Sequence, residues 1–313
     1  MKTTTLFFEE NTKSISISNC TIDRKIGVDN QPSYSIICSA QERFEVNNLR
    51  IDSSGGIYFN PTVKLADYII INEIELSNSK YGIICNSQIE EEKILKSFNL
   101  EYFYFKHLQQ AFNIRIKENE YIIYYGRIEN CNNEFYKNPK GEEKHGIIEI
   151  TFGESSTENN NNNNIRFCIE RTEFFNNEYL ISRNNKNEKP GGGIGLVIET
   201  TSTVPLLFKI EITRCIFISN NAKTNNEEVL IQSSGGAFYF PSNFVLNEDE
   251  EEIETIIGLE SLTITDCLFI NNTASNKGGA IYIGYNSNLK SIYIKDTMEC
   301  PGYRYREIES CLK

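Results

Sequence analysis

The sequence lacks most of the residues on which common catalytic and metal sites depend. It contains no tryptophan and two histidines, and its nine cysteines include no Cys-x-x-Cys pair. The sequence therefore contains no recognisable group of His and Cys residues that could bind zinc. The chain also lacks the run of about 18 to 20 apolar residues that a membrane-spanning helix requires. Residues 1–10 hold three consecutive apolar side chains before two acids, so they do not form a recognisable signal peptide.

The charge of the chain is one-sided. Thirty-one basic and 43 acidic side chains give a formal net charge of −12 at pH 7, and no basic cluster offsets it. This balance argues against a protein that binds nucleic acid or an anionic membrane by charge. The chain is instead rich in isoleucine and contains 17 Tyr and 19 Phe, a composition that favours strands over helices.

The clearest positive feature is an internal repeat. Residues 210–221 recur as residues 262–273, and each copy has two alternating pairs of apolar residues separated by one extra residue. Alternation places each pair on one face of a strand, and the extra residue resets the phase as a bend would. Each copy is followed by a Gly-Gly-Ala step, at 235–237 and 278–280. A chain that bends at fixed intervals and keeps one face inward winds around a core, so the repeat predicts a β-solenoid.

The same template fits further copies along the chain. They start at residues 15, 44, 69, 98, 128, 167, 210, 262 and 292, so neighbouring starts lie 25 to 52 residues apart. The shortest intervals suit one turn of a three-sided helix of short strands, and the longer ones carry insertions. We predict an all-β chain with one parallel β-helix over residues 1–297. Insertions are expected near 88–118, 154–164, 182–191 and 246–255, with a short helix in the first. An antiparallel sandwich stays open as the alternative.

Each repeated residue type has a physical task in this prediction. Phe and Cys at inward positions stack on their counterparts one coil away, and Asn ends a strand by bonding turn backbone. Gly-Gly supplies the positive φ or the close backbone approach of a sharp corner. The residues assigned to these structural roles are Cys215, Phe217, Asn220, Gly235, Gly236, Cys267, Phe269, Asn272, Gly278 and Gly279.

Two further cysteines lie outside the repeat. Cys300 and Cys311 flank a Pro-Gly-Tyr sequence, and residues 298–313 resemble the start of a cysteine-containing C-terminal segment. We expect these two thiols to form a disulfide if the chain is secreted. The odd total of nine cysteines does not indicate a complete disulfide framework.

The sequence predicts no catalytic, cofactor-binding or metal-binding residue. Arg115-Ile116-Lys117 matches a substrate-binding triplet of polygalacturonases, but no pair of facing carboxylates can be placed beside it. In polygalacturonases a Gly-His-Gly motif precedes this triplet. The nearest candidate here, Lys144-His145-Gly146, follows it. The glycines of 191–195 do not open a helix and are interpreted as a turn. Residues 19–21 and 271–273 are N-glycosylation sequons, which matter only in a secreted chain.

The paired motifs resemble a known family. Phe269-Ile270-Asn271-Asn272 with Gly278-Gly279-Ala280-Ile281, and the looser 217–220 with 235–238, are similar to the repeats of the polymorphic outer membrane proteins of chlamydiae and of related protozoan surface proteins. The resemblance covers residues 165–295 well and the rest faintly. It implies a right-handed parallel β-helix of pectin-lyase-like architecture, with a role in surface display or adhesion. The family's secretion signal and membrane-anchoring region are not recognisable here.

These observations lead to one functional hypothesis and one rival. We expect a non-catalytic surface or secreted β-helix that acts as a scaffold or adhesin and is part of a longer polypeptide. Its partner would be a glycan or protein ligand on a cell surface, with no nucleic acid and no cofactor. A cytoplasmic location stays open. The rival is a carbohydrate-active enzyme, a polysaccharide lyase, hydrolase or epimerase, built on the same fold.

Overall fold

The computed structural model describes residues 6–8, 12–23, 34–38, 42–52, 55–59, 68–79, 81–85, 97–108, 110–116, 120–129, 131–134, 148–152, 164–181, 206–224, 235–240, 244–246, 252–254, 257–275, 278–283, 289–295 and 297–300. The regular structure within these ranges is β-strand throughout, as the composition predicts.

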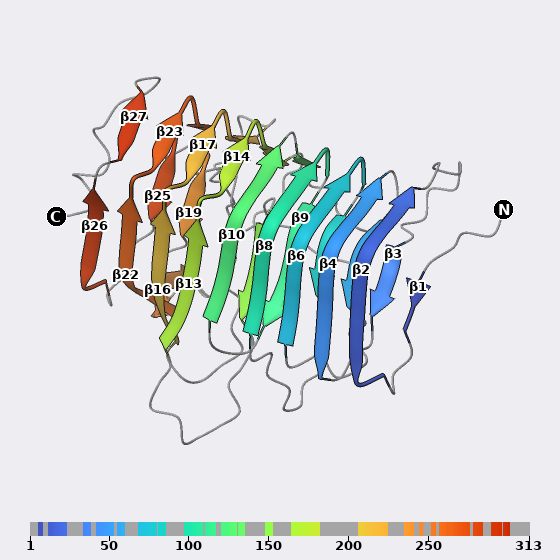
Figure 1. The fold of residues 1–313 in the computed structure, drawn as a ribbon. Coiled ribbons are helices and arrows are strands. Elements are labelled where there is room, and N and C mark those ends of the chain that lie inside the picture. Colours follow the sequence, from blue (N-terminus) through green and yellow to red (C-terminus); the bar gives the residue numbers. More distant parts are fainter. Residues whose placement is uncertain are drawn as a thin grey trace, which may run out of the picture.

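The largest sheet is a row of parallel strands that runs the length of the molecule (Figure 1). Its main part contains, in spatial order, β2 (Ser14–Asp23), β4 (Arg43–Asp52), β6 (Tyr68–Ser77), β8 (Ser97–Lys106), β10 (Glu120–Glu129), β13 (Asn164–Glu170), β16 (Leu206–Thr213), β22 (Ile257–Thr265) and β26 (Ser291–Lys295). From β10 a second part continues through β14 (Glu173–Phe175), β17 (Ile216–Ile218), β23 (Leu268–Ile270) and β27 (Met298–Cys300). We call the two parts together the long sheet.

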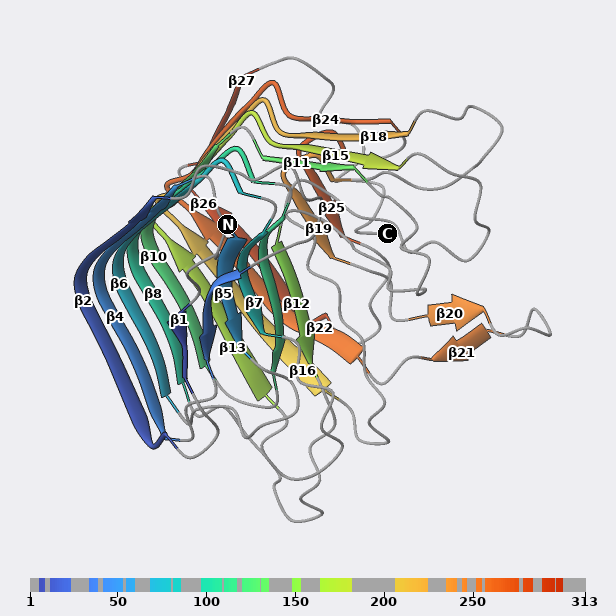
Figure 2. The same cartoon turned by 90° about the vertical axis from the view of Figure 1, so that its right-hand side faces the viewer.

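Three other parallel sheets accompany the long sheet (Figure 2). The second sheet contains β1 (Leu6–Phe7), β3 (Tyr34–Cys38), β5 (Gly55–Phe59), β7 (Tyr81–Cys85), β9 (Gln110–Ile116) and β12 (Ile148–Phe152). The third contains β11 (Asn132–Glu134), β15 (Glu178–Ile181), β18 (Asn221–Thr224) and β24 (Thr273–Ala274). The fourth pairs β19 (Phe238–Phe240) with β25 (Ile281–Ile283). An antiparallel pair, β20 (Phe244–Leu246) and β21 (Glu252–Glu254), lies apart from these sheets.

From β2 to β10 the chain alternates between the long sheet and the second sheet. Strands that are two apart in sequence therefore become neighbours in space, and their pairing is parallel. The core lies between the sheets, where apolar side chains of the long sheet meet those of the second and fourth sheets. Phe44 of β4 packs edge-on against Phe59 of β5, with ring centroids 4.9 Å apart. In the described ranges every strand pair except β20–β21 is parallel, which argues against the antiparallel sandwich left open by the sequence.

The strand pairing confirms most of the repeat template. The starts at 15, 44, 69, 98, 167, 210, 262 and 292 lie in register along the long sheet. The start at Ile128 is wrong, because Ile128 pairs with Phe105, and the residue aligned with Phe98 is Tyr121. The template failed here because Gly126 takes the third apolar position, opposite Phe103.

The extra residue of the template is a left-handed bend. The residues at this position have φ between 49° and 57°, and they are Asn19, Asn48, Glu73, Tyr102, Arg171, Arg214 and Asp266. A second left-handed bend follows the second apolar pair, at Asn78, His107, Asn176, Ser219 and Asn271. Non-glycine residues adopt this conformation infrequently, and Asn and Asp adopt it most readily. Each bend turns the strand so that the next apolar pair faces the core again.

Identical residues stack across neighbouring coils inside the core. Phe217 stacks on Phe174 with a centroid distance of 4.8 Å and on Phe269 at 4.7 Å, and the rings are within 5° of parallel. Cys215 and Cys267 occupy one column as free thiols, and the backbone N–H of Cys215 donates to Cys267 Sγ over 3.4 Å. Burial raises the pKa of the Cys215 thiol well above its ordinary value.

A buried asparagine ladder runs beside the phenylalanine stack. Asn220 Nδ2 donates to Asn272 Oδ1 and to the Phe174 carbonyl, both over 2.9 Å. Asn177 Nδ2 donates in the same way to Asn220 Oδ1 over 2.9 Å and to the Ile128 carbonyl over 3.1 Å. Because each amide bonds both backbone and the next amide, the ladder satisfies polar groups that would otherwise be costly inside the core.

The Gly-Gly corners combine two separate requirements. Gly235 and Gly278 have φ of 66° and 59°, the left-handed region that glycine enters without a Cβ penalty. Gly236 instead needs its small size, because a Cβ there would lie 2.3 Å from the backbone oxygens of Gly279 and Thr273. At Gly279 a Cβ would meet only the Asn272 carbonyl oxygen, at 3.2 Å.

The structure describes some of the segments predicted to be insertions and not others. The expected insertion near 88–118, with its short helix, is wrong for residues 97–106 and 110–116, which form β8 and β9 in the two main sheets. Residues 154–163 and 182–191 lie outside the described ranges. The insertion expected near 246–255 overlaps the antiparallel pair β20 and β21.

Phe103 and Gly126 form a complementary pair that mutation can test. A Cβ at Gly126 would lie 1.9 Å from Cζ of the Phe103 ring, so Gly126→Ala is expected to lower the free energy of unfolding by about 1 to 3 kcal/mol through overpacking. Adding Phe103→Leu should recover about 1 kcal/mol of this loss, because the shorter side chain leaves room. Chemical denaturation of the two single variants and the double variant measures the coupling. Strictly additive losses would contradict the pairing.

The two Gly-Gly corners provide a matched comparison. Gly236→Ala is expected to cost about 3 kcal/mol, at the upper end of overpacking, because the contacts are with backbone oxygens that cannot move independently. Gly279→Ala, the same motif position one coil later, should cost about 1 kcal/mol or less because it meets one atom at a longer distance. Thermal unfolding of both variants gives the order. Equal losses would show that backbone conformation, not the neighbouring coil, fixes these glycines.

Candidate functional site: the outer face of the long sheet

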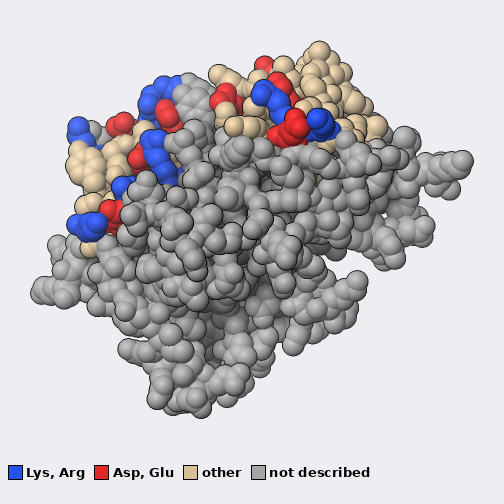
Figure 3. All heavy atoms as spheres, turned by 90° about the horizontal axis from the view of Figure 1, so that it is seen from below, with Lys and Arg blue, Asp and Glu red and all other residues tan. Residues whose placement is uncertain are grey.

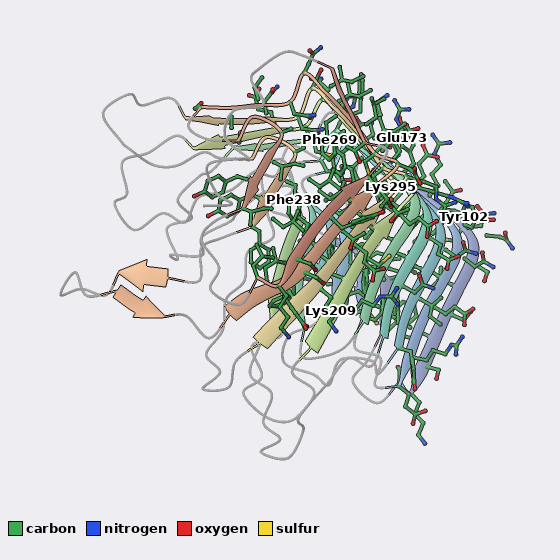
Figure 4. All side chains as sticks on the ribbon, turned by 90° about the vertical axis from the view of Figure 1, so that its left-hand side faces the viewer. Tyr102, Glu173, Lys209, Phe238, Phe269 and Lys295 are labelled. Atoms are coloured by element: carbon green, nitrogen blue, oxygen red, sulfur yellow. The ribbon has the colours of Figure 1, made fainter. Side chains whose placement is uncertain are left out.

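The candidate site is the outer face of the long sheet, defined as the side chains of its strands that point away from the core. Along β4, Phe44, Val46 and Leu49 are buried while Arg43 and Asn47 between and beside them are exposed. Figure 4 shows the same division, with Tyr102 pointing away from the ribbon and Phe238 and Phe269 on the inner side. Because the period of a strand is two, every strand adds residues to this face.

Ion pairs join neighbouring strands across the outer face. The pairs and their N···O distances are Arg50–Glu75 at 3.6 Å, Arg127–Glu173 at 2.9 Å, Arg166–Glu211 at 2.9 Å, Arg214–Glu170 at 2.8 Å and Lys290–Glu260 at 2.9 Å. Exposed pairs of this kind contribute about 0 to 1 kcal/mol each. Their main effect is electrostatic balance, and Figure 3 shows acidic and basic side chains intermixed on the visible described surface.

The carboxylate of Glu260 lies between two lysines. Its carboxylate accepts from Lys290 Nζ over 2.9 Å and lies 3.5 Å from Lys209 Nζ. The hydrogen bond from Lys290 and the charge of Lys209 lower the pKa of Glu260 below its ordinary value. A general acid near neutral pH needs the opposite shift. Glu260 therefore links strands and is not suited to donate a proton.

Amide side chains line the bend of the first strands. Asn48 Nδ2 donates to Asn19 Oδ1 over 2.8 Å, and Asn72 Nδ2 donates to Asn47 Oδ1 over 3.4 Å. On β8, Asn99 Nδ2 donates to a Glu101 carboxylate oxygen over 3.0 Å. These groups give the N-terminal half of the face a band of hydrogen-bonding side chains next to the left-handed corners.

Exposed aromatic side chains lie on the same face. Tyr102 is 53% exposed at the bend of β8, and Tyr68 at the start of β6 is 42% exposed. Phe175 of β14 is 36% exposed, with the Arg127 guanidinium carbon 5.6 Å from its ring centroid. Sequence reasoning did not single out Tyr102. The available signal was its place at the extra position of the template, which the structure shows to be an outward corner.

Of the residues weighed for chemistry in the sequence, the structure describes two. Arg115 and Ile116 lie on β9 in the second sheet, while Lys117, residues 144–146 and residues 191–195 fall outside the described ranges. Among the residues that the structure describes, no three His, Cys, Asp or Glu side chains are placed to hold a metal ion. Cys300 ends β27, opposite Ile270, and Cys311 is not described, so the structure does not test their pairing.

In the described part of the chain, no helix has the length and apolar character to cross a membrane.

Comparison with known families identifies one segment. Residues 266–284 match the Chlamydia polymorphic membrane protein repeat, a stretch that runs from the bend at Asp266 through the Phe269 stack and the Gly278-Gly279 corner. No curated protein and no solved structure matches the chain. The chain therefore carries, at residues 266–284, the repeat of the family that its paired motifs resemble.

Proposed function

We propose that the chain is a right-handed parallel β-helix of pectin-lyase-like architecture that works as a non-catalytic surface or secreted scaffold with adhesin-like binding. Parallel pairing of strands that alternate between sheets supports the β-helix. Crossovers between parallel strands of one sheet are right-handed in about 98% of cases, which supports the hand. The repeat at residues 266–284 comes from a family of surface proteins and supports the location.

The observation that carries the binding role is the outer face itself. It extends over nine strands in the main part of the long sheet, its ion pairs balance one another, and it presents tyrosines beside amide groups. Many weak contacts spread along such a face can hold a glycan or protein ligand. A reaction needs closely converging groups instead. Tyrosine suits a contact surface because it combines a large apolar ring with a polar tip at low entropic cost.

The rival function is a carbohydrate-active enzyme. It needs two carboxylates at a controlled separation, or basic and metal-binding groups on adjacent coils. On the described outer face, Glu170, Glu173, Glu211 and Glu260 each lie against an arginine or lysine. Turnover assays separate the two functions. The purified chain, incubated with pectic, alginate-type and host glycans with or without Ca²⁺, should release no reducing ends and no unsaturated products.

Tyr102 provides the test of binding. Tyr102→Asn removes the ring and keeps the corner, because Asn19 and Asn48 hold the same left-handed position in β2 and β4. We expect retention on glycan arrays or cultured cell surfaces to fall about tenfold, the effect of losing one central aromatic contact, with the thermal unfolding temperature unchanged.

A second variant on the same face is Tyr68→Ser. Serine occupies the aligned positions Ser14 and Ser97 in β2 and β8, so the strand tolerates it. Retention is expected to fall with this variant too, because Tyr68 is exposed on the outer face. Binding that survives Tyr102→Asn unchanged would remove this part of the face from the proposal. Product formation abolished by changing one acidic residue would favour the enzyme.

A further inference from the structure

The two N-glycosylation sequons occupy similar places in the fold. Asn19 and Asn271 each stand at a left-handed corner, with φ of 51° and 50°, and both are exposed. The sequence contains no other Asn-x-Ser/Thr with x other than proline. Asparagine is common at such corners because its short side chain tolerates the conformation. A threonine two residues later is not required by the corner, since Asn48 and Asn176 are followed there by Arg50 and Glu178.

The amide of Asn19 is oriented for modification. Its Oδ1 accepts from Asn48 Nδ2 over 2.8 Å, so its own Nδ2, the atom that a glycan would occupy, lies on the other branch of the amide, away from that bond. β2 is the edge strand of the long sheet, and no described strand of that sheet borders Asn19 on its other side. Thr21, which completes the sequon, is exposed.

The adjacent residues Asn271 and Asn272 lie in opposite environments, one exposed and one buried. Asn271 is exposed at the corner, whereas Asn272 is 8% exposed and donates through Nδ2 to the Phe217 carbonyl over 2.9 Å. The sequon therefore falls on the outward member of the pair. β24, which begins two residues after Asn271, is the edge strand of the third sheet among the described residues. On the other side of the corner, β23 ends at Ile270 and pairs with β27.

We propose that Asn19 and Asn271 are N-glycosylated when the chain passes through a eukaryotic secretory pathway. In this reaction the Asn Nδ2 attacks C1 of an oligosaccharide carried on a lipid diphosphate. An N–C bond forms, the C1–O bond to the diphosphate breaks, the diphosphate leaves, and the amide proton passes to a base. This inference rests on the surface or secreted location proposed above, because a chain meets the lipid-linked oligosaccharide only in the secretory pathway.

The positions of the two asparagines also give the glycans a physical role. Edge strands expose unpaired backbone groups that invite pairing with other chains, and proteins commonly cover such edges. A glycan on Asn19 lies beside the β2 edge, and one on Asn271 beside the β24 edge. Asn19 belongs to the amide band at the first end of the outer face, so a glycan there would shield the β2 edge and also border that end of the face.

The test is to secrete the full 313-residue chain from eukaryotic cells behind a cleavable signal peptide and to measure its mass before and after amidase deglycosylation. Two glycans are expected, with Asn19→Gln and Asn271→Gln each removing one and the double variant carrying none. Enzymatic deglycosylation should shift the native protein toward larger species in size-exclusion chromatography. A secreted chain that carries no glycan at either residue would overturn the proposal.

A control variant tests whether exposure of the asparagine at the corner, in addition to the sequon itself, is needed for glycosylation. Ala274→Thr in the Asn271→Gln background moves the sequon onto buried Asn272, where a glycan cannot fit inside the ladder. This variant is expected to be retained in the cell or secreted without a glycan at that residue. Secretion at the parent level with Asn272 modified would show that exposure at the corner is not decisive. Because glycan occupancy is read from mass and the proposed function from binding at Tyr102, each can fail without the other.

Discussion

The left-handed residue between two apolar pairs is the constraint on which this structure depends. A strand that alternates strictly would send its second apolar pair to the wrong face after one extra residue. Placing that extra residue at φ near 50° bends the chain and restores the inward direction. The same bend at the same position in neighbouring strands keeps these strands in register, so that Asn19, Asn48 and Glu73 lie in one row between paired positions.

Because neighbouring strands are in register, residues at the same position of successive repeats lie next to one another. The phenylalanine stack, the cysteine column and the asparagine ladder all follow from one repeat being laid on the next. A departure from the repeat has to be compensated by a neighbouring coil, and the Phe103 ring beside Gly126 is such a case. The outer face is the other result of the same geometry, because the outward residues of each repeat continue the rows of the repeat before it.

Sequence reasoning could reach the parts of the fold that depend on pattern within one coil. The apolar pairs around Cys215 and Cys267 and the asparagines that follow them predicted the strands, bends and stacking partners. It failed at Gly126, because the residue that fills the space belongs to another coil. It also misjudged residues 97–116, where charged and amide residues next to the strands suggested an insertion. The outer face was harder to predict, since Tyr102 is distinguished by exposure at a corner and not by any motif.

The central claim is that equivalent residues lie one strand spacing apart along a single stack. Ser16, Glu211 and Thr263 occupy one outward row, on the first, seventh and eighth strands of the long sheet. Double electron–electron resonance between unnatural amino-acid spin labels at these positions measures the spacing directly. With about 4.8 Å per strand, the Ser16 to Glu211 distance between Cα atoms should be about 29 Å and the Ser16 to Thr263 distance about 34 Å. Distances that do not increase by one strand spacing from Glu211 to Thr263 would contradict the stack.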